Sequence, residues 1–247
     1  MLDQIEEHGF GTVEDYQQFH GLKVDGELGP VTERSLRAPR ICGHPDRMSM
    51  SNVKPWKKRH LKWKIDGSLP RITQSQFSAA AKKAFTFWSN VCGLTFEETR
   101  GNDADIVITT GRIDGPFGTL AWSELSDGTD RRKTQKYDSK EPWVISLNPP
   151  RNYIGLIHVL CHEIGHVIGM VHEAFSGIKA LMNPTYDPAI YKPQTTDENR
   201  ATGMYGPPIQ TPGGTNAGED KGDMVWVALQ VPRSQVLESK DSLAALF

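Results

Sequence analysis

The sequence predicts an α+β protein made of two unequal parts. Residues 1–38 carry short helical patterns without a strand pattern. Residues 61–206 contain both short alternating segments, which are typical of strands, and longer segments with helical spacing. The 247 residues are enough for one or two domains with buried cores.

Composition excludes several classes of function. Hydrophobic residues make up 37% and charged residues 23%, and the formal net charge is −2, so nucleic acid and anionic membranes are not expected partners. No apolar run approaches the roughly 20 residues of a membrane span. The N-terminal MLDQIEEHGFG lacks a basic segment followed by an apolar one, so no signal peptide is expected. Three cysteines are too few, and odd in number, for a disulfide framework.

The N-terminal part is expected to be a small helical domain over residues 1–46. Its run GLKVDGELGPVTE predicts two glycine-containing turns around Val24, followed by a helix that starts at Pro-Val-Thr. Residues 47–60 are polar and basic without periodicity, which indicates a linker. Lys57, Lys58 and Arg59 make this linker a target for a trypsin-like protease.

The second part, residues 61–206, has a mixed pattern in which strands and helices follow one another. Its expected strands are 61–65, 105–110, 119–125 and 143–148, and its expected helices are 72–91, 152–169 and 195–206. Thr196 or Asp197 is expected to cap the last helix. Residues 207–247 have the composition of a linker and a tail, and their role is open.

The segment HEIGHVIGMVH predicts a catalytic metal site. His162 and His166 are four residues apart on the predicted helix, so their side chains share one face and can bind one ion. Gly169 can adopt a left-handed conformation, end the helix and let the chain bring in His172 as a third ligand. Three imidazoles with one open position are the ligand set of a catalytic zinc, and Glu163 is placed to act on a water molecule there.

His158 continues the spacing of four residues but is not an expected ligand. It lies eight residues from His166, or about 12 Å along a helix, which is too far for both to bind one ion at about 2.1 Å. A packed or hydrogen-bonded histidine is the simpler interpretation. Cys92 and Cys161 are likewise expected to be small packed residues.

HEIGHVIGMVH followed by ALMNPTY resembles the metzincin zinc endopeptidases, and specifically the matrixins (matrix metalloproteinases). The segments LKWKI, AFTFWSNVCGLTFEE, ADIVI, DGPFGTLAW and MYGPP are also similar to matrixin segments in matching order. The resemblance covers about residues 61–208, and residues 1–46 resemble the matrixin prodomain, which is related to peptidoglycan-binding domains. It implies a twisted, mixed, five-stranded sheet with an active-site helix, preceded by a small all-α prodomain.

The resemblance also implies supporting and substrate-binding residues. Met182 is implied as the residue of the Met-turn beneath the zinc histidines. Pro184 and Tyr186 are implied to form one wall of the pocket for the substrate side chain after the scissile bond. Leu120 and Ala121 are implied to lie on the edge strand that pairs with an extended peptide.

The metal complement is expected to differ in part from the family's pattern. Matrixins usually carry a second, structural zinc, but Trp122 and Lys136 stand at two of its ligand positions, so this zinc is expected to be missing. A neighbouring calcium site is implied, whose hard oxygen ligands suit that ion. Its carboxylates and carbonyls would come from Asp114, Gly115, Phe117, Thr119, Asp138 and Glu141. Ordinary surface acids in a loop are the alternative.

The segment PRICGHPD resembles the end of a matrixin prodomain, where a cysteine thiolate occupies the open position on zinc. Cys42 is the implied latency ligand, and Asp46 could pair with Arg40 to hold the loop. Two features depart from the family's pattern. Ile41 is inserted between the arginine and the cysteine, which leaves the register of Arg40 open, and His44 could itself compete for the zinc.

The function implied is that of a latent zinc endopeptidase which acts on protein or peptide substrates after an activating protease cuts the linker. Two alternatives remain: a metzincin whose N-terminal domain tethers it to peptidoglycan, and a binding module without catalysis. The intact Glu163 and its three histidines argue against the second. A secreted or extracellular location is implied by the resemblance alone.

Overall fold

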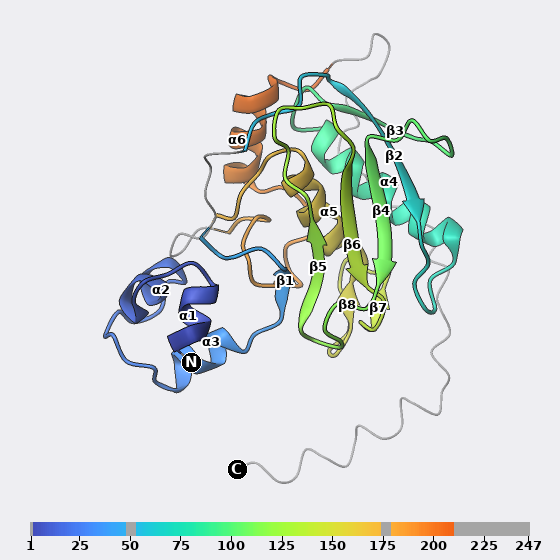
Figure 1. Ribbon diagram of the computed structural model, residues 1–247. Helices are drawn as coiled ribbons and strands as arrows, with labels where there is room; N and C mark the ends of the chain where they lie inside the picture. The colour runs from blue at the N-terminus through green and yellow to red at the C-terminus, as the bar shows by residue number, and fades with distance from the viewer. Residues whose placement is uncertain (1, 48–52, 174–178, 210–247) are drawn as a thin grey trace. The chain divides into compact units, whose positions relative to one another are not determined.

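The computed structural model describes residues 2–47, 53–173 and 179–209 (Figure 1). Its elements in chain order are α1 (Leu2–Glu7), α2 (Val13–Phe19), α3 (Pro30–Leu36), β1 (Arg40–Cys42), β2 (His60–Asp66), α4 (Gln74–Ser89), β3 (Thr95–Glu98), β4 (Ile106–Gly111), β5 (Thr119–Ser123), β6 (Lys133–Asp138), β7 (Trp143–Val144), β8 (Ile154–Gly155), α5 (Leu156–Val167) and α6 (Thr195–Tyr205). The predicted α+β class is confirmed.

The N-terminal domain consists of three short helices around an aromatic core. Phe10 and Tyr16 meet edge to face within this core, with ring centroids 5.5 Å apart. The predicted turns precede α3, which begins at Pro30 as expected. The buried amide of Gln17 fixes the second turn, because it donates to Asp25 and accepts the backbone N–H of Gly26. Gly26 has φ +73°, a conformation that favours glycine.

A mixed sheet forms the centre of the second domain, with strand order β1-β5-β6-β4-β2-β3. β5 runs antiparallel to β6, and the other neighbouring strands are parallel. Five of these strands, β2 to β6, belong to the second domain and confirm the implied five-stranded sheet. The sixth, β1, comes from the end of the N-terminal domain and pairs with β5, so that domain is not all-α. An edge strand that is covered in this way cannot pair with another peptide.

Helices α4 and α5 pack against each other on one face of the sheet (Figure 1). The Thr73 side chain and Gln76 form a capping box at the start of α4. The indole of Trp88 on α4 donates to the carbonyl of Cys161 on α5 at 2.8 Å, which ties the two helices together. Gly169 has φ +92° just after α5, which confirms its predicted role in ending that helix.

Sequence patterning missed β1, β3, β6 and β8 and extended one strand too far. β6 has no apolar alternation, because Lys133 and Gln135 occupy buried positions where apolar residues are expected. The expected strand 143–148 is only the two-residue β7, which pairs with β8 in a separate small sheet. The expected cap of α6 was also wrong: Gln194 is the N-cap, and Asp197 takes part at the third helical position.

The predicted linker over residues 47–60 differs from the structure in its second half. Trp56 is buried, and its indole donates to the carbonyl of Val167 at 2.8 Å. Lys58 forms an ion pair with Asp105, and the carbonyl of Arg59 accepts the backbone N–H of Thr95. These contacts make residues 54–60 part of the second domain. Residues 48–52 lie outside the described residues.

Within the described residues, no helix has both the length and the apolar character needed to cross a bilayer.

Candidate metal centre

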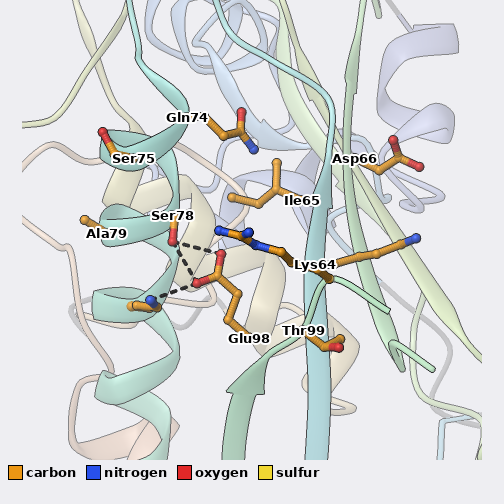
Figure 2. A pocket seen from close by; sticks show the side chains of 11 residues that line it. Lys64, Ile65, Asp66, Gln74, Ser75, Ser78, Ala79, Glu98 and Thr99 are labelled. Atoms are coloured by element: carbon orange, nitrogen blue, oxygen red, sulfur yellow. Dashed lines mark hydrogen bonds and ion pairs between the residues drawn. The ribbon is translucent and has the colours of Figure 1, made fainter. Parts of the chain in front are cut away.

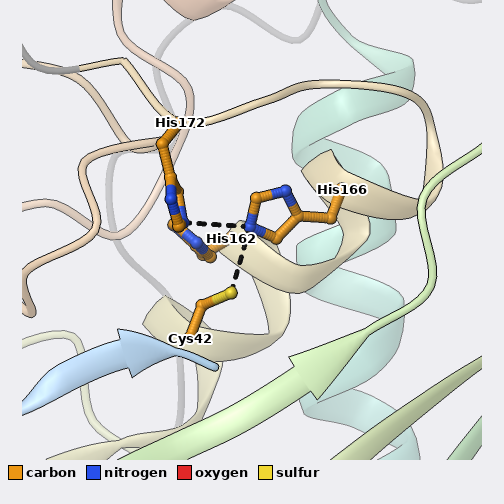
Figure 3. Close-up of side chains that lie close together, drawn as sticks. All are labelled: Cys42, His162, His166 and His172. Carbon is orange, nitrogen blue, oxygen red and sulfur yellow. Dashed lines mark hydrogen bonds between the residues drawn. The ribbon is translucent and has the colours of Figure 1, made fainter. Parts of the chain in front are cut away.

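Helix α5 and the turn after it bring three histidines together, as the motif predicted. His162 and His166 lie on one face of α5, and the chain turns back at Gly169 to place His172 beside them (Figure 3). Cys42 of β1 completes the group, in which the four ligand atoms all lie within 4.8 Å of one another. All four residues are buried, and among the described residues this is the only such group of metal-binding side chains.

Backbone carbonyls orient each imidazole through Nδ1. The Nδ1–H of His162 donates to Leu181 at 2.8 Å and that of His166 donates to Met170 at 2.7 Å. The Nδ1–H of His172 donates to the carbonyl of Pro45 at 2.8 Å. Because a carbonyl can only accept, these bonds fix the proton on Nδ1 and leave the Nε2 lone pair free for a metal.

The spacing of the donor atoms fits a tetrahedral zinc. His166 Nε2 lies 3.2 Å from His172 Nε2 and 3.3 Å from Cys42 Sγ. Two nitrogens bound to a tetrahedral zinc would be about 3.4 Å apart, and a nitrogen and a sulfur about 3.6 Å apart. Two imidazole lone pairs at 3.2 Å repel each other unless a cation lies between them. The donor set therefore fits zinc.

Electrostatics favour the protonation states that a metal needs. Burial lowers the pKa of His162 to about 3 and the pKa values of His166 and His172 well below the ordinary value, which keeps all three imidazoles neutral. Burial and the Glu163 carboxyl raise the pKa of Cys42 well above its ordinary value. A thiolate at this position therefore requires a positive charge beside it, which zinc supplies.

Glu163 is fully buried beside the four ligands. Burial raises its pKa well above the ordinary value, an effect that the neighbouring Cys42 side chain partly offsets, and no hydrogen bond of ordinary geometry reaches either carboxyl oxygen from the described residues. Its backbone carbonyl accepts the Ser123 hydroxyl at 3.0 Å, which ties α5 to the end of β5. An orphan carboxyl in a buried metal site is suited to act on a water molecule or a substrate.

The inserted Ile41 does not prevent Arg40 from reaching Asp46. The two form an ion pair in which Asp46 is 1% exposed. His20 also contacts the Asp46 carboxylate at 2.7 Å, and His8 lies at 3.5 Å. Burial alone would raise the pKa of Asp46, but hydrogen bonds from His20, His8 and Arg40 hold it below the ordinary value. No sequence pattern pointed to these two histidines, because they lie far from Asp46 along the chain.

His44 is not a member of the metal-binding group. Its Nε2 donates to the carbonyl of Ser123 at 2.6 Å, and its backbone N–H donates to Cys42 Sγ at 3.2 Å. This residue therefore supports the sulfur ligand rather than replacing it, and the competition considered from sequence does not occur in this arrangement.

The segment around β1 lies in a groove between two walls. On one side, β1 pairs in parallel with β5, with Cys42 opposite Ala121. On the other side, the N–H of Ile41 donates to the carbonyl of Pro184, and the N–H of Tyr186 donates to that of Pro39. Leu120, the other residue implied on the edge strand, is buried in β5. The substrate-binding residues implied by the resemblance thus border the segment that carries Cys42.

Met182 lies against Gly165 of α5. A Cβ atom on Gly165 would lie only 2.4 Å from Met182 Sδ, so glycine is required for this close approach. The buried Asp197 of α6 holds the turn, because it accepts the backbone N–H groups of Leu181 at 2.7 Å and Met182 at 3.3 Å. The sequence suggested Asp197 only as a helix cap.

The loop implied to bind calcium gathers three carboxylates, but not as tightly as the histidine group. Asp138 accepts four backbone N–H groups, including those of Asp114 and Gly115. Asp114 accepts the N–H of Thr119, and Glu141 accepts that of Phe117 at 3.0 Å. Burial and the neighbouring acids raise the pKa of Glu141 to about 7, and its Oε1 has no partner among the described residues. Calcium binding by these residues stays a prediction.

The positions of the family's structural zinc hold a different pair here. Trp122 of β5 lies opposite Lys136 of β6 in the sheet register. His158, which was weighed as a possible ligand, instead donates from Nε2 to the carbonyl of Pro188 at 3.0 Å. Its interpretation as a hydrogen-bonded histidine agrees with this contact.

A second hollow lies on the far edge of the sheet, between β2, β3 and the start of α4 (Figure 2). Its volume is about 760 Å³, and its walls include Ile65, Lys64 and Arg100. The carboxylate of Glu98 at its centre is already satisfied by the Ser78 hydroxyl at 2.8 and 2.9 Å and by Lys82 at 2.8 Å. None of the predicted site residues lines this hollow.

Comparisons with known proteins agree with this geometry. Residues 55–206 match the matrixin family. Interstitial collagenase A of Mus musculus is 34% identical over 236 residues, which cover 89% of this chain and 49% of that protein. Macrophage metalloelastase of Rattus norvegicus is 30% identical over 220 residues, which cover 83% and 46%. Matrix metalloproteinase-18 of Xenopus laevis is 30% identical over 242 residues, which cover 91% and 50%.

These matches place the chain among proteins whose named members include collagenases and a metalloelastase. The chain belongs to the matrixin family, whose members use a catalytic zinc and calcium. It spans about half the length of the curated relatives it matches.

Proposed function

We propose that the chain is a latent zinc endopeptidase in which the thiolate of Cys42 blocks the catalytic metal. The observation that carries this proposal is the convergence of the Cys42 sulfur with three neutral imidazoles, 3.3 Å from His166 Nε2. A structural site would have the same four ligands, but it would not bury an orphan glutamate beside them. Nor would it draw one ligand from a separate domain.

The proposed reaction uses Glu163 to move one proton twice. Zinc, when bound by His162, His166 and His172, lowers the pKa of water toward about 7 and polarises a carbonyl group. Glu163 takes the proton from the attacking water and then gives it to the leaving amine of the cleaved bond. The Ser123 hydroxyl holds the Glu163 backbone and so keeps this carboxyl beside the metal.

Protein or peptide segments in an extended conformation are the proposed substrates. The segment from Pro39 to Gly43 supports this proposal, because its extended backbone hydrogen-bonds to β5 on one side and to residues 184–186 on the other. A substrate would use the same edge of β5 by strand addition. The relatives are named as collagenases and a metalloelastase, which supports protein substrates and, with them, an extracellular location.

Activation is proposed to follow a cut between residue 46 and Lys54. From Lys54 onward the backbone is bound to the second domain, since its N–H donates to the carbonyl of Ser126 at 3.0 Å. The buried Trp56 continues this attachment. A cut at Lys57 to Arg59, which the sequence suggested, would need local unfolding.

The test compares hydrolysis of a quenched peptide by wild type, Cys42→Ser and Glu163→Gln, each with and without a zinc chelator. We expect Cys42→Ser to be active without a cut, wild type to be silent until cut, and Glu163→Gln to bind zinc but remain inactive. Activity of Glu163→Gln that equals the Cys42→Ser level would refute the assigned base. Equal activity of uncut wild type and Cys42→Ser would refute latency only.

Binding of peptidoglycan by the N-terminal domain stays a prediction. Retention of the full chain on insoluble peptidoglycan would test it, and the contact of Pro45 with His172 already gives this domain a role without a glycan.

A further inference from the structure

Trp122 lies beside the groove on the side away from Pro184 and Tyr186. It is one of the few large apolar side chains exposed in the described residues, with 38% of its surface accessible. Its ring lies beside the segment that carries Cys42, residues 39–44, which we call the latency segment. A Cβ atom on Gly43 would lie 3.5 Å from Trp122 Cδ1, and the His44 ring is tilted by 33° at a centroid distance of 6.5 Å. An indole in this place is available to any peptide that replaces the segment.

The two ends of the groove can be assigned from the contacts of the latency segment. Pro39 and Ile41 contact the wall at residues 184–186, which the matrixin resemblance assigns to the substrate side chain after the scissile bond. Gly43 and His44 lie beyond Cys42 and bind the other end of β5, through the carbonyls of Ala121 and Ser123. The metal group lies between these two ends. Trp122 therefore borders the substrate residues that precede the scissile bond.

We propose that Trp122 determines specificity by stacking against a flat side chain two or three residues before the scissile bond. This inference rests on the proposed endopeptidase function. In the latent chain, His44 occupies the position, with its imidazole beside the indole. In a substrate, a phenylalanine, tyrosine or histidine side chain takes its place.

The chemistry of the site favours a flat ring over an acidic or a small side chain. The indole offers a broad apolar face, and offset stacking on it adds to ordinary burial. The carbonyl of Ser123, which accepts His44 Nε2 at 2.6 Å, adds an acceptor for a ring N–H and repels a carboxylate. The residue paired with Trp122 on the neighbouring strand β6 is Lys136, which is not aromatic and so does not compete for stacking on the indole.

The experiment uses the full chain with a site for a sequence-specific protease placed at residues 48–52, so that every variant is activated by the same cut. Internally quenched peptides differ only at the second and third residues before the scissile bond, which carry Phe, His, Gly or Asp. Mass spectrometry confirms that the cleaved bond does not move. The readout is the ratio of kcat/KM for the Phe or His peptide to kcat/KM for the Gly peptide.

We expect the wild type to prefer the flat residues by about two- to twelvefold, the range of an aromatic pair. Trp122→Ala should reduce this ratio to about one, Trp122→Phe should retain most of it, and Lys136→Ala, on the neighbouring strand, should keep the wild-type ratio. If Trp122→Ala cleaves the Gly peptide normally and keeps the wild-type preference, the inference is wrong. If wild type cleaves none of the peptides, the proposed function itself fails.

Discussion

Asp46→Asn should weaken latency without a cut, because the Asp46 carboxylate organises the loop that carries Cys42. Asp46 is 1% exposed and is surrounded by the guanidinium of Arg40 and by the rings of His20 and His8. The substitution keeps the size of the side chain and removes its charge. The amide has one accepting oxygen instead of two and carries no charge, so it cannot satisfy all three groups, and Arg40 loses its ionic partner.

The free-energy cost of Asp46→Asn follows from the burial of the Arg40–Asp46 ion pair. Removing one partner of a buried ion pair costs about 3–5 kcal/mol. Arg40 is 22% exposed and keeps its hydrogen bond to the carbonyl of His44 at 2.7 Å, so a smaller cost than for a fully buried pair, about 2–3 kcal/mol, is appropriate here. Since 1.4 kcal/mol is a factor of ten, the fraction of chains with Cys42 away from the metal should rise about 30- to 150-fold.

The assay is the rate of quenched-peptide hydrolysis by the uncut chain, with gel electrophoresis to show that no cut has occurred. Glu33→Gln is the matched control, because it also removes an acid from the N-terminal domain. Its partner Arg37 lies 3.4 Å away in an exposed pair that contributes little to stability. An Asp46→Asn chain as silent as wild type, in an experiment where Cys42→Ser is active, would refute the coupling of Asp46 to latency.

Three further perturbations test the framework of the site. Gly165→Ala places a Cβ atom 2.4 Å from Met182 Sδ and should cost about 1–3 kcal/mol of unfolding free energy, measured by urea denaturation; an unchanged midpoint would contradict the tight packing. Asp197→Asn leaves one buried N–H of the Met-turn without an acceptor and should cost about 1–3 kcal/mol in the same measurement, where wild-type stability would count against its role. Because the pKa of Glu141 in the fold, about 7, exceeds its ordinary value of 4.5, its contribution to stability is present below 4.5 and is lost as the pH rises through 7. Calcium should therefore raise Tm more at pH 8 than at pH 5.5, by an amount equivalent to at most about 3 kcal/mol; an equal rise at both pH values would contradict calcium binding at Glu141.

The metal centre could be predicted because its information is local in the sequence. Two ligands lie one helical turn apart, the third follows a glycine that ends the helix, and helical geometry alone places them together. Cys42 lies 120 residues before His162, and no physical rule applied to the sequence connects the two. The prediction that Cys42 joins the metal centre rested on the resemblance of PRICGHPD to a prodomain segment. In the structure, its sulfur contacts His166.

The parts that could not be predicted depend on polar groups buried by tertiary contacts. β6 has no apolar alternation, because Lys133 is buried through its ion pair with Asp127 at 2.8 Å rather than through hydrophobic packing. His8 and His20 likewise meet Asp46 only after the small helical domain has folded. Patterning rules assume that buried positions are apolar, and they fail wherever a partner satisfies a buried charge.

In the proposed activation, release of the N-terminal domain would change the metal centre at two points. The fourth ligand, Cys42, would leave, and the Pro45 carbonyl that orients His172 would leave with it. The acceptors of the other two histidines, Leu181 and Met170, belong to the second domain and stay in place. Because such outer hydrogen bonds fix the orientation and basicity of a ligand, only His172 has to find a new acceptor on activation. The latent chain should therefore hold its zinc more tightly than the cut enzyme, which the rate of zinc loss to a chelator can measure for both forms.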